Sequence, residues 1–272
     1  KALAIILIVN KEDEIPATDK YISLCLSGDE VSQDIAELVK DNLIYKKSST
    51  GTYVFKTRAG IELKTEIKKQ RTLKGDNVDF AKVLEEISGK HFVIPRKYNS
   101  QHMMTRYFVN QFMSVDDFMR ISNAASLLSD CKADGKIITL FSFSDINQEL
   151  IKEHCELLNC NRLVVLCPKE CLRVQKQLKD YDIIQDLKNN YLFTNNNEIL
   201  KRELPLLIED ITSEIEDILY RVYLEENAKV FYFSNDSLQI AHSEKEESIV
   251  NLCCEEIYNK TVLVNNELVN SM

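Results

Sequence analysis

The fold of the N-terminal part of the chain is decided by residues 31–71, VSQDIAELVKDNLIYKKSSTGTYVFKTRAGIELKTEIKKQR. They begin as an amphipathic helix with Ile35 on its apolar face, and the period then changes without a gap. Two β-prone segments follow, residues 43–47 and 52–57, joined by a polar turn that contains Gly51. Glycine accepts positive φ at no steric cost, so the two segments are expected to pair antiparallel. The stretch therefore predicts a helix that leads directly into a β-hairpin.

Three expected helices and this hairpin follow one another in the order of a winged-helix domain. Residues 2–9 and 21–26 have helical patterns and precede the helix and hairpin. In a winged helix, one helix enters the major groove of DNA and the hairpin, or wing, contacts the backbone. We therefore predict a winged helix in residues 1–75, with residues 58–74 as a connecting helix. The residues expected to contact nucleic acid from the wing are Tyr45, Lys46, Lys47, Tyr53, Lys56 and Arg58.

A local excess of positive charge supports a polyanion as the partner of this region. Between Tyr45 and Gly75 there are nine basic and two acidic residues, a local charge of +7, whereas the whole chain carries −9. A positive region on an acidic protein orients the approach of a polyanion, because the remaining surface repels it. Two alternatives stay open: many winged helices bind only protein, and Lys-rich helices are often solvated faces.

The composition is typical of a two-domain globular protein. The chain has 272 residues, of which 44% are apolar and 28% are charged. Its eight cysteines lie mostly in apolar segments, which indicates reduced core residues and a cytoplasmic location. The apolar run at residues 2–9 is too short to span a membrane. Because the chain starts with Lys1 and enters a core segment at once, we expect it to be a piece of a longer polypeptide.

The rest of the chain, residues 76–272, predicts an α/β domain. Residues 136–143 and 162–167 are continuous apolar strands, and the amphipathic helix between them favours a parallel connection. Residues 198–226 form a long helical pattern with nine acidic and three basic residues. The expected fold class is therefore mixed α/β: an N-terminal winged helix, then a domain with a partly parallel sheet and a long acidic helix.

A second basic and aromatic segment, residues 91–108, lies in the α/β domain. It contains Arg96, Lys97 and Arg106 and no acidic residue. Pro95 precedes the first two, so we expect a loop there, where contacts with phosphates or bases are common. The three basic residues join the candidate nucleic-acid-binding set, while the aromatic rings of the segment are interpreted as core.

The motifs of catalysis and metal binding are missing from the sequence. Neither a P-loop nor a G-x-G-x-x-G motif occurs, and the six glycines do not cluster. The cysteines lack the paired C-x-x-C spacing of zinc sites, and no G-x-S-x-G elbow is present. Acid-x-Lys pairs of the nuclease type fall only on helical patterns. We predict no catalytic, metal or cofactor-binding residue, and keep a metal-dependent nuclease or nucleotide-binding fold in residues 76–272 as an alternative.

Three segments of the chain resemble the large P-loop ATPase of BREX phage-defence systems, the BrxC/PglY type. They are NLIYKK...GTYVFKTRAG (residues 42–60), RKYN...TRYF (96–108) and NNELVN (265–270). The resemblance implies an AAA-like protein that uses ATP and magnesium and acts with other subunits to block phage DNA replication and support methylation of host DNA. The P-loop and the magnesium-binding acid of that family are not in this sequence, so the chain would be an interior region downstream of the motor.

We therefore expect a non-catalytic fragment of an antiviral-defence ATPase that contacts DNA or another defence subunit and has no membrane partner. An alternative is a protein-interaction platform, in which the acidic helix at residues 198–226 binds another subunit or a basic face of the motor. The residues expected to bind that partner are Glu209, Asp210, Glu214 and Glu216.

Overall fold

The computed structural model divides the chain into two compact units. The N-terminal unit contains residues 1–78 and 176–215, and the C-terminal unit contains residues 79–175 and 216–272. Sequence analysis divides the chain after residue 75 instead, and that domain division stays a prediction. The residues that the structure describes are 1–9, 11, 14–26, 31–41, 43–47, 50–55, 58–75, 77–129, 131–190, 194, 198–243 and 246–259, without the side chains of 58–62, 64, 198, 199 and 225.

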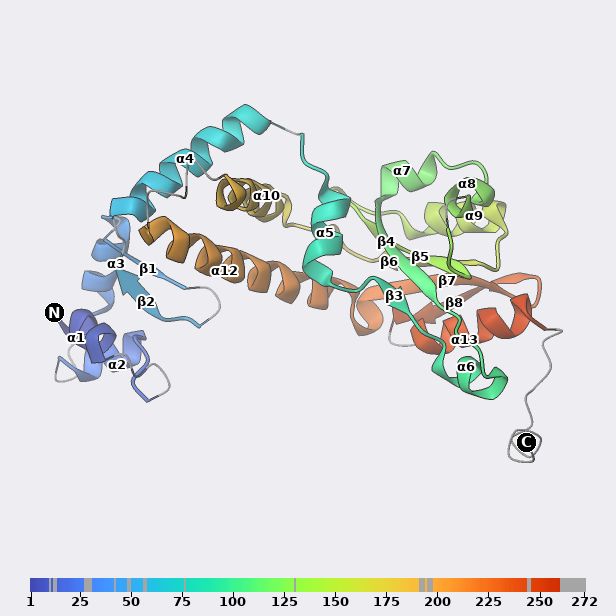
Figure 1. Ribbon diagram of the computed structural model, residues 1–272, viewed down its shortest axis with the longest axis horizontal. Helices are drawn as coiled ribbons and strands as arrows, with labels where there is room; N and C mark the ends of the chain where they lie inside the picture. The colour runs from blue at the N-terminus through green and yellow to red at the C-terminus, as the bar shows by residue number, and fades with distance from the viewer. Residues whose placement is uncertain are drawn as a thin grey trace. The chain divides into compact units, whose positions relative to one another are not determined.

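Three helices and a hairpin share the first hydrophobic core of the N-terminal unit. The elements are α1 (Ala2–Val9), α2 (Asp19–Leu24), α3 (Ser32–Lys40) and the antiparallel strands β1 (Ile44–Lys46) and β2 (Tyr53–Phe55) (Figure 1). Gly51 adopts φ +66° between the strands, as the predicted turn requires. Leu3 of α1, Ile35 of α3 and Ile44 of β1 are buried together. The predicted helix and hairpin are confirmed, whereas a winged helix as a whole stays a prediction.

A second core of the N-terminal unit joins three longer helices. They are α4 (Arg58–Lys74), α10 (Gln175–Asn189) and α12 (Glu198–Tyr223). Ile67 of α4, Ile184 of α10 and Leu204 of α12 belong to one buried cluster. The apolar residues of α4 indicate that one face of this helix is buried. They do not indicate that the helices that bury this face lie more than a hundred residues later in the chain.

The C-terminal unit is built on a six-stranded mixed sheet. Its strands are β3 (Phe92–Val93), β4 (Phe108–Ser114), β5 (Gly135–Phe141), β6 (Leu163–Pro168), β7 (Ala228–Ser234) and β8 (Ser237–His242). They lie in the order β3-β4-β5-β6-β7-β8; β4, β5 and β6 are parallel and the other neighbours are antiparallel. The predicted mixed α/β class with a partly parallel sheet is confirmed.

Helices cover both faces of this sheet (Figure 1). The face packed by the crossover helices carries α7 (Val115–Met119), α8 (Ala124–Leu128) and α9 (Gln148–Leu158), and the opposite face carries α6 (Arg96–His102) and α13 (Glu246–Ile257). The remaining elements of the unit are α5 (Phe80–Ser88), before β3, and a 3-10 turn (Glu225–Asn227), before β7. Two covered faces explain why β5 and β6 are continuous apolar runs.

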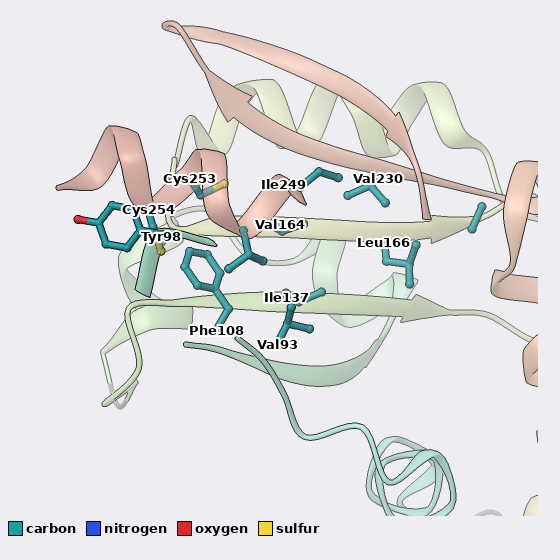
Figure 2. Close-up of a cluster of buried hydrophobic side chains, with 12 residues drawn as sticks. Val93, Tyr98, Phe108, Ile137, Val164, Leu166, Val230, Ile249, Cys253 and Cys254 are labelled. Atoms are coloured by element: carbon teal, nitrogen blue, oxygen red, sulfur yellow. The ribbon is translucent and has the colours of Figure 1, made fainter. Parts of the chain in front are cut away.

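The sheet face under α13 is filled by apolar side chains from the three parallel strands (Figure 2). Phe108 of β4, Ile137 of β5 and Val164 of β6 are each no more than 1% exposed. Alternation along a strand places every second side chain on the same face. Asn110 and Thr139 continue this alternation on β4 and β5, so two buried polar residues lie on an otherwise apolar face.

Candidate functional site

Two residues of the predicted wing, Lys46 and Tyr53, contact a carboxylate of the same unit. Lys46 Nζ lies 3.1 Å from Asp19 Oδ2, and the Tyr53 hydroxyl donates a hydrogen bond to Asp19 Oδ1 at 3.0 Å. Lys46 Nζ also lies 5.2 Å from the centroid of the Tyr53 ring. Burial raises the pKa of Asp19, but the hydrogen bonds from Lys46 and Tyr53 outweigh it, so this pKa lies below its ordinary value. Lys46 and Tyr53 are thus held by an internal carboxylate.

The other wing residues predicted to bind nucleic acid have different surroundings. Tyr45 is half-buried, and its pKa is raised by burial and by carboxylates of α12, Asp210 first among them. Lys47 is half-buried. Lys56 and the side chain of Arg58 lie outside the described residues. Tyr45 therefore lies near negative charge, an environment that repels phosphate.

Two cations of α4, Arg71 and Lys74, are paired with acids inside the N-terminal unit. Arg71 Nη2 lies 2.6 Å from Asp180 Oδ1, and Lys74 Nζ lies 2.5 Å from carboxylate oxygens of both Asp182 and Asp186. These acids belong to α10, so they compensate part of the positive charge counted along the sequence. The unit as a whole has 18 basic and 20 acidic residues, and it therefore carries no net positive charge.

The second basic segment forms a helix from Arg96 onward, so the loop predicted there is wrong. α6 starts at Arg96, directly after Pro95, because the fixed φ of proline is compatible with a helix N-terminus. Arg96 has a side chain 80% exposed, with Nη1 3.9 Å from Glu247 Oε2, and Lys97 is exposed beside it in the sequence. Arg96 and Lys97 are therefore accessible to a partner.

Arg106, the last predicted nucleic-acid-binding residue, makes contacts that stabilise the C-terminal unit. Its Nη1 lies 2.9 Å from Asp134 Oδ1, and its guanidinium carbon lies 3.9 Å from the centroid of the Tyr258 ring. Asp134 also accepts hydrogen bonds from Tyr258 OH at 2.6 Å and from Tyr107 N at 2.9 Å. The Asp134 side chain is only 9% exposed. Sequence analysis does not reveal this cluster because its members are far apart in the chain.

Two of the four acidic residues predicted to bind a protein partner are exposed on α12, namely Glu209 and Glu216. Glu214 is half-buried and accepts a hydrogen bond from a glutamine of α10 at 3.0 Å. Asp210 is half-buried near Tyr45. α12 therefore offers Glu209 and Glu216 to a partner, while Asp210 and Glu214 face other parts of the N-terminal unit.

The C-terminal unit contains a cavity that sequence analysis does not predict. Its volume is about 360 Å³, and it lies over β4, β5 and β6 on the face that carries α13. The side chains that define it most clearly are Asn110, Phe112, Thr139, Leu166, Glu216 and Tyr223. The available signal is the presence of Asn110 and Thr139 inside apolar strands, where a polar side chain needs a partner.

The buried cysteines are unsuited to nucleophilic chemistry. Burial raises the pKa of the thiols of Cys155, Cys167, Cys253 and Cys254 to about 12. A thiol with such a pKa stays protonated at neutral pH, whereas the thiolate is the nucleophile and metal ligand. The core interpretation is confirmed for these four, while Cys25 is exposed.

Among the described residues, no group of three or more His, Cys, Asp or Glu side chains is placed to hold a metal ion. The glycines there that adopt positive φ, Gly51, Gly75 and Gly89, lie in separate turns and form no phosphate cradle. The ATP and magnesium implied by the resemblance, and the nuclease alternative, stay predictions. Over the same residues, no helix combines the length and apolar character needed to cross a membrane.

No family model, curated protein or solved structure matches the chain in comparisons with known proteins. The resemblance to the phage-defence ATPase therefore stays a prediction.

Proposed function

We propose that this chain is a non-catalytic docking module of a larger phage-defence ATPase, and that α12 contacts the partner. The observation that carries the proposal is a contrast between two exposed carboxylates of α12 and three paired cations of the N-terminal unit. Glu209 and Glu216 of α12 are exposed, whereas Lys46, Arg71 and Lys74 are paired with carboxylates of their own unit. Exposed carboxylates favour a basic protein surface over DNA.

Four of the exposed side chains of α12 form a stripe along the helix. Leu206, Glu209, Glu216 and Tyr220 are exposed, and their spacing of three, seven and four residues places them on one face. Leu206 is 43% exposed and Tyr220 is 65% exposed. Such a mixture of apolar, aromatic and charged groups suits a protein interface, in which the apolar groups supply contact area and the charges select the partner. The partner that fits is a basic face of another defence subunit or of the motor.

The test uses the full-length ATPase and the other subunits of its defence system. Glu209→Lys and Glu216→Lys together reverse both charges of the stripe. Glu153→Lys is the matched control, because Glu153 is an exposed glutamate of a different helix, α9. We expect the double variant to bind the partner subunit at least about tenfold more weakly, and the control to bind normally. Equal binding by all three proteins would contradict docking through α12.

DNA binding is a second candidate, favoured by the exposed Arg96 and Lys97 of α6. Phosphate contacts release counterions, so they make affinity depend on salt. If these side chains contact DNA, Arg96→Ala with Lys97→Ala will reduce both the affinity and its salt dependence. Arg120→Ala is the control, because the Arg120 side chain is 77% exposed, close to the 80% of Arg96. An unchanged salt dependence would remove this candidate.

A further inference from the structure

The cavity of the C-terminal unit has walls suited to a small organic molecule. Its volume of about 360 Å³ is within the usual range of small-molecule sites. Phe112 and Leu166 come from the sheet, and Leu219 and Tyr223 come from α12. Leu166 lies on the same sheet face as Val164, nearer the carboxyl end of β6 (Figure 2). The cavity thus extends the apolar core toward the ends of the parallel strands, where α/β folds commonly bind ligands.

A buried polar pair lies among these apolar walls. Thr139 Oγ1 donates a hydrogen bond to Asn110 Oδ1 at 2.8 Å, and Asn110 Nδ2 donates one to Lys90 O at 3.0 Å. Asn110 is 7% exposed and Thr139 is 3% exposed. A side-chain amide has two N–H donors and two acceptor lone pairs, and these bonds use one of each. The remaining donor and acceptor suit a neutral ligand group that can both accept and donate.

Charged side chains around the cavity disfavour anions. Lys90 Nζ donates a hydrogen bond to Glu246 Oε2, and Glu246 is buried. Glu246 thus neutralises the positive charge of Lys90, and Glu216 adds a second carboxylate to the lining. An anionic ligand would meet this excess of negative charge in a partly desolvated site. The lining therefore excludes phosphates and carboxylates more strongly than neutral or cationic groups.

We propose that this cavity binds a small planar molecule with an amide-type edge and no negative charge, such as a free heterocyclic base. The rings of Phe112, Tyr220 and Tyr223 contact its apolar surface. Asn110 and Thr139 bind its polar edge. The cavity shares Glu216 and Tyr220 with the stripe on α12, but its polar pair, Asn110 and Thr139, is not part of the stripe, so ligand binding is tested separately from docking.

Three probes of nearly equal size and shape distinguish the effect of ligand charge from that of ligand shape: neutral benzamide, cationic benzamidine and anionic benzoate. Binding to the whole chain is followed by NMR of labelled leucine methyl groups. Leu166, Leu219 and Leu224 line the cavity and act as reporters, while Leu63 and Leu204 of the N-terminal unit act as controls. We expect saturable shifts of the reporters alone with benzamide and benzamidine, and at least about tenfold weaker binding of benzoate.

Variants then test the polar pair and the aromatic wall separately. Thr139→Val keeps the volume but removes the hydroxyl, so benzamide should bind about fivefold more weakly. Because this change also removes a partner of buried Asn110 and lowers stability, Tyr220→Ala is a second variant. Tyr220 is 65% exposed, and its removal should weaken benzamide and benzamidine without affecting the fold. Leu157→Ala, at a position of α9 that is 82% exposed, should leave binding unchanged.

Two results would overturn the proposal. The first is the absence of saturable shifts of the reporter leucines with all three probes up to about 10 mM, a concentration that detects even fragment-level affinity. The second is binding of benzoate as tight as that of benzamide, because it would show that the carboxylates of the lining do not discriminate against anionic ligands.

Discussion

Replacing Arg106 distinguishes a structural role from a role in DNA binding. Arg106 pairs with Asp134, whose side chain is 9% exposed, and its guanidinium lies over Tyr258. In Arg106→Ala, Asp134 keeps its hydrogen bonds from Tyr107 N and Tyr258 OH. The cost therefore lies at the lower end of the range of about 3–5 kcal/mol for breaking a buried ion pair. We expect the C-terminal unit to lose about 3 kcal/mol of stability.

Hydrogen exchange in β5 is the appropriate assay. The chain has two compact units, so a single unfolding transition of the whole chain does not report on one of them. The amides of Gly135–Phe141 lie in the centre of the C-terminal sheet and exchange mainly through its unfolding. A loss of about 3 kcal/mol corresponds to roughly 100-fold faster exchange of these amides.

Two further variants complete the test of Arg106. Arg106→Lys keeps the charge but loses the planar fork, so we expect an intermediate effect. Lys97→Ala changes an exposed side chain of α6 and should alter stability by less than about 0.5 kcal/mol. The structural interpretation is refuted if Arg106→Ala leaves β5 exchange unchanged while it weakens DNA binding.

The remaining predictions concern the hairpin and the thiols. The pKa of Asp19 is lowered in the folded state, so its ion pair with Lys46 stabilises the fold above about pH 4 and this contribution disappears as the pH falls through the lowered pKa. The stability of the N-terminal unit in Asp19→Asn, followed by hydrogen exchange in β1, should therefore differ from that of the unmodified chain at pH 7, and the difference should shrink as the pH falls through the lowered pKa. Lys46→Ala should change DNA affinity, measured by fluorescence anisotropy, by less than about twofold, because this cation is already paired. A thiol reagent should modify exposed Cys25 rapidly and buried Cys253 only on unfolding, as mass spectrometry of the labelled peptides would show.

Local patterns were sufficient to predict the hairpin, the parallel strands and the mixed α/β class, whereas the loop predicted at Arg96 is a helix. The change of period after the helix that contains Ile35, with Gly51 between two β-prone segments, predicted the hairpin. The apolar runs of β5 and β6 around an amphipathic helix predicted parallel strands. The packing of α10 in the N-terminal unit was not predictable in this way. The few apolar residues of α4 indicate that they are covered, but they do not indicate which helix covers them.

The candidate sites were predictable only in part, because a count of charges along the chain does not include acidic residues that the fold brings close from elsewhere in the sequence. Lys46 and Arg71 contribute to a positive stretch in the sequence, but Asp19 and Asp180 are brought beside them by the fold. The sequence also did not indicate which acidic side chains of α12 are exposed, because nothing in the sequence distinguishes Glu209, which is exposed, from Glu214, which is half-buried. The cavity was missed because an asparagine within a strand has no interpretation until its partner, on another strand, is known.

Carboxyl footprinting of the proposed full-length ATPase, with and without its proposed partner subunits, tests docking through α12 most directly. A carbodiimide and an amine label exposed carboxylates, and mass spectrometry measures the labelling of each residue. The account predicts that the partner reduces labelling of Glu209 and Glu216 and leaves that of Glu153 on α9 unchanged. Equal labelling of Glu209 and Glu216 in the free and the bound protein would contradict it.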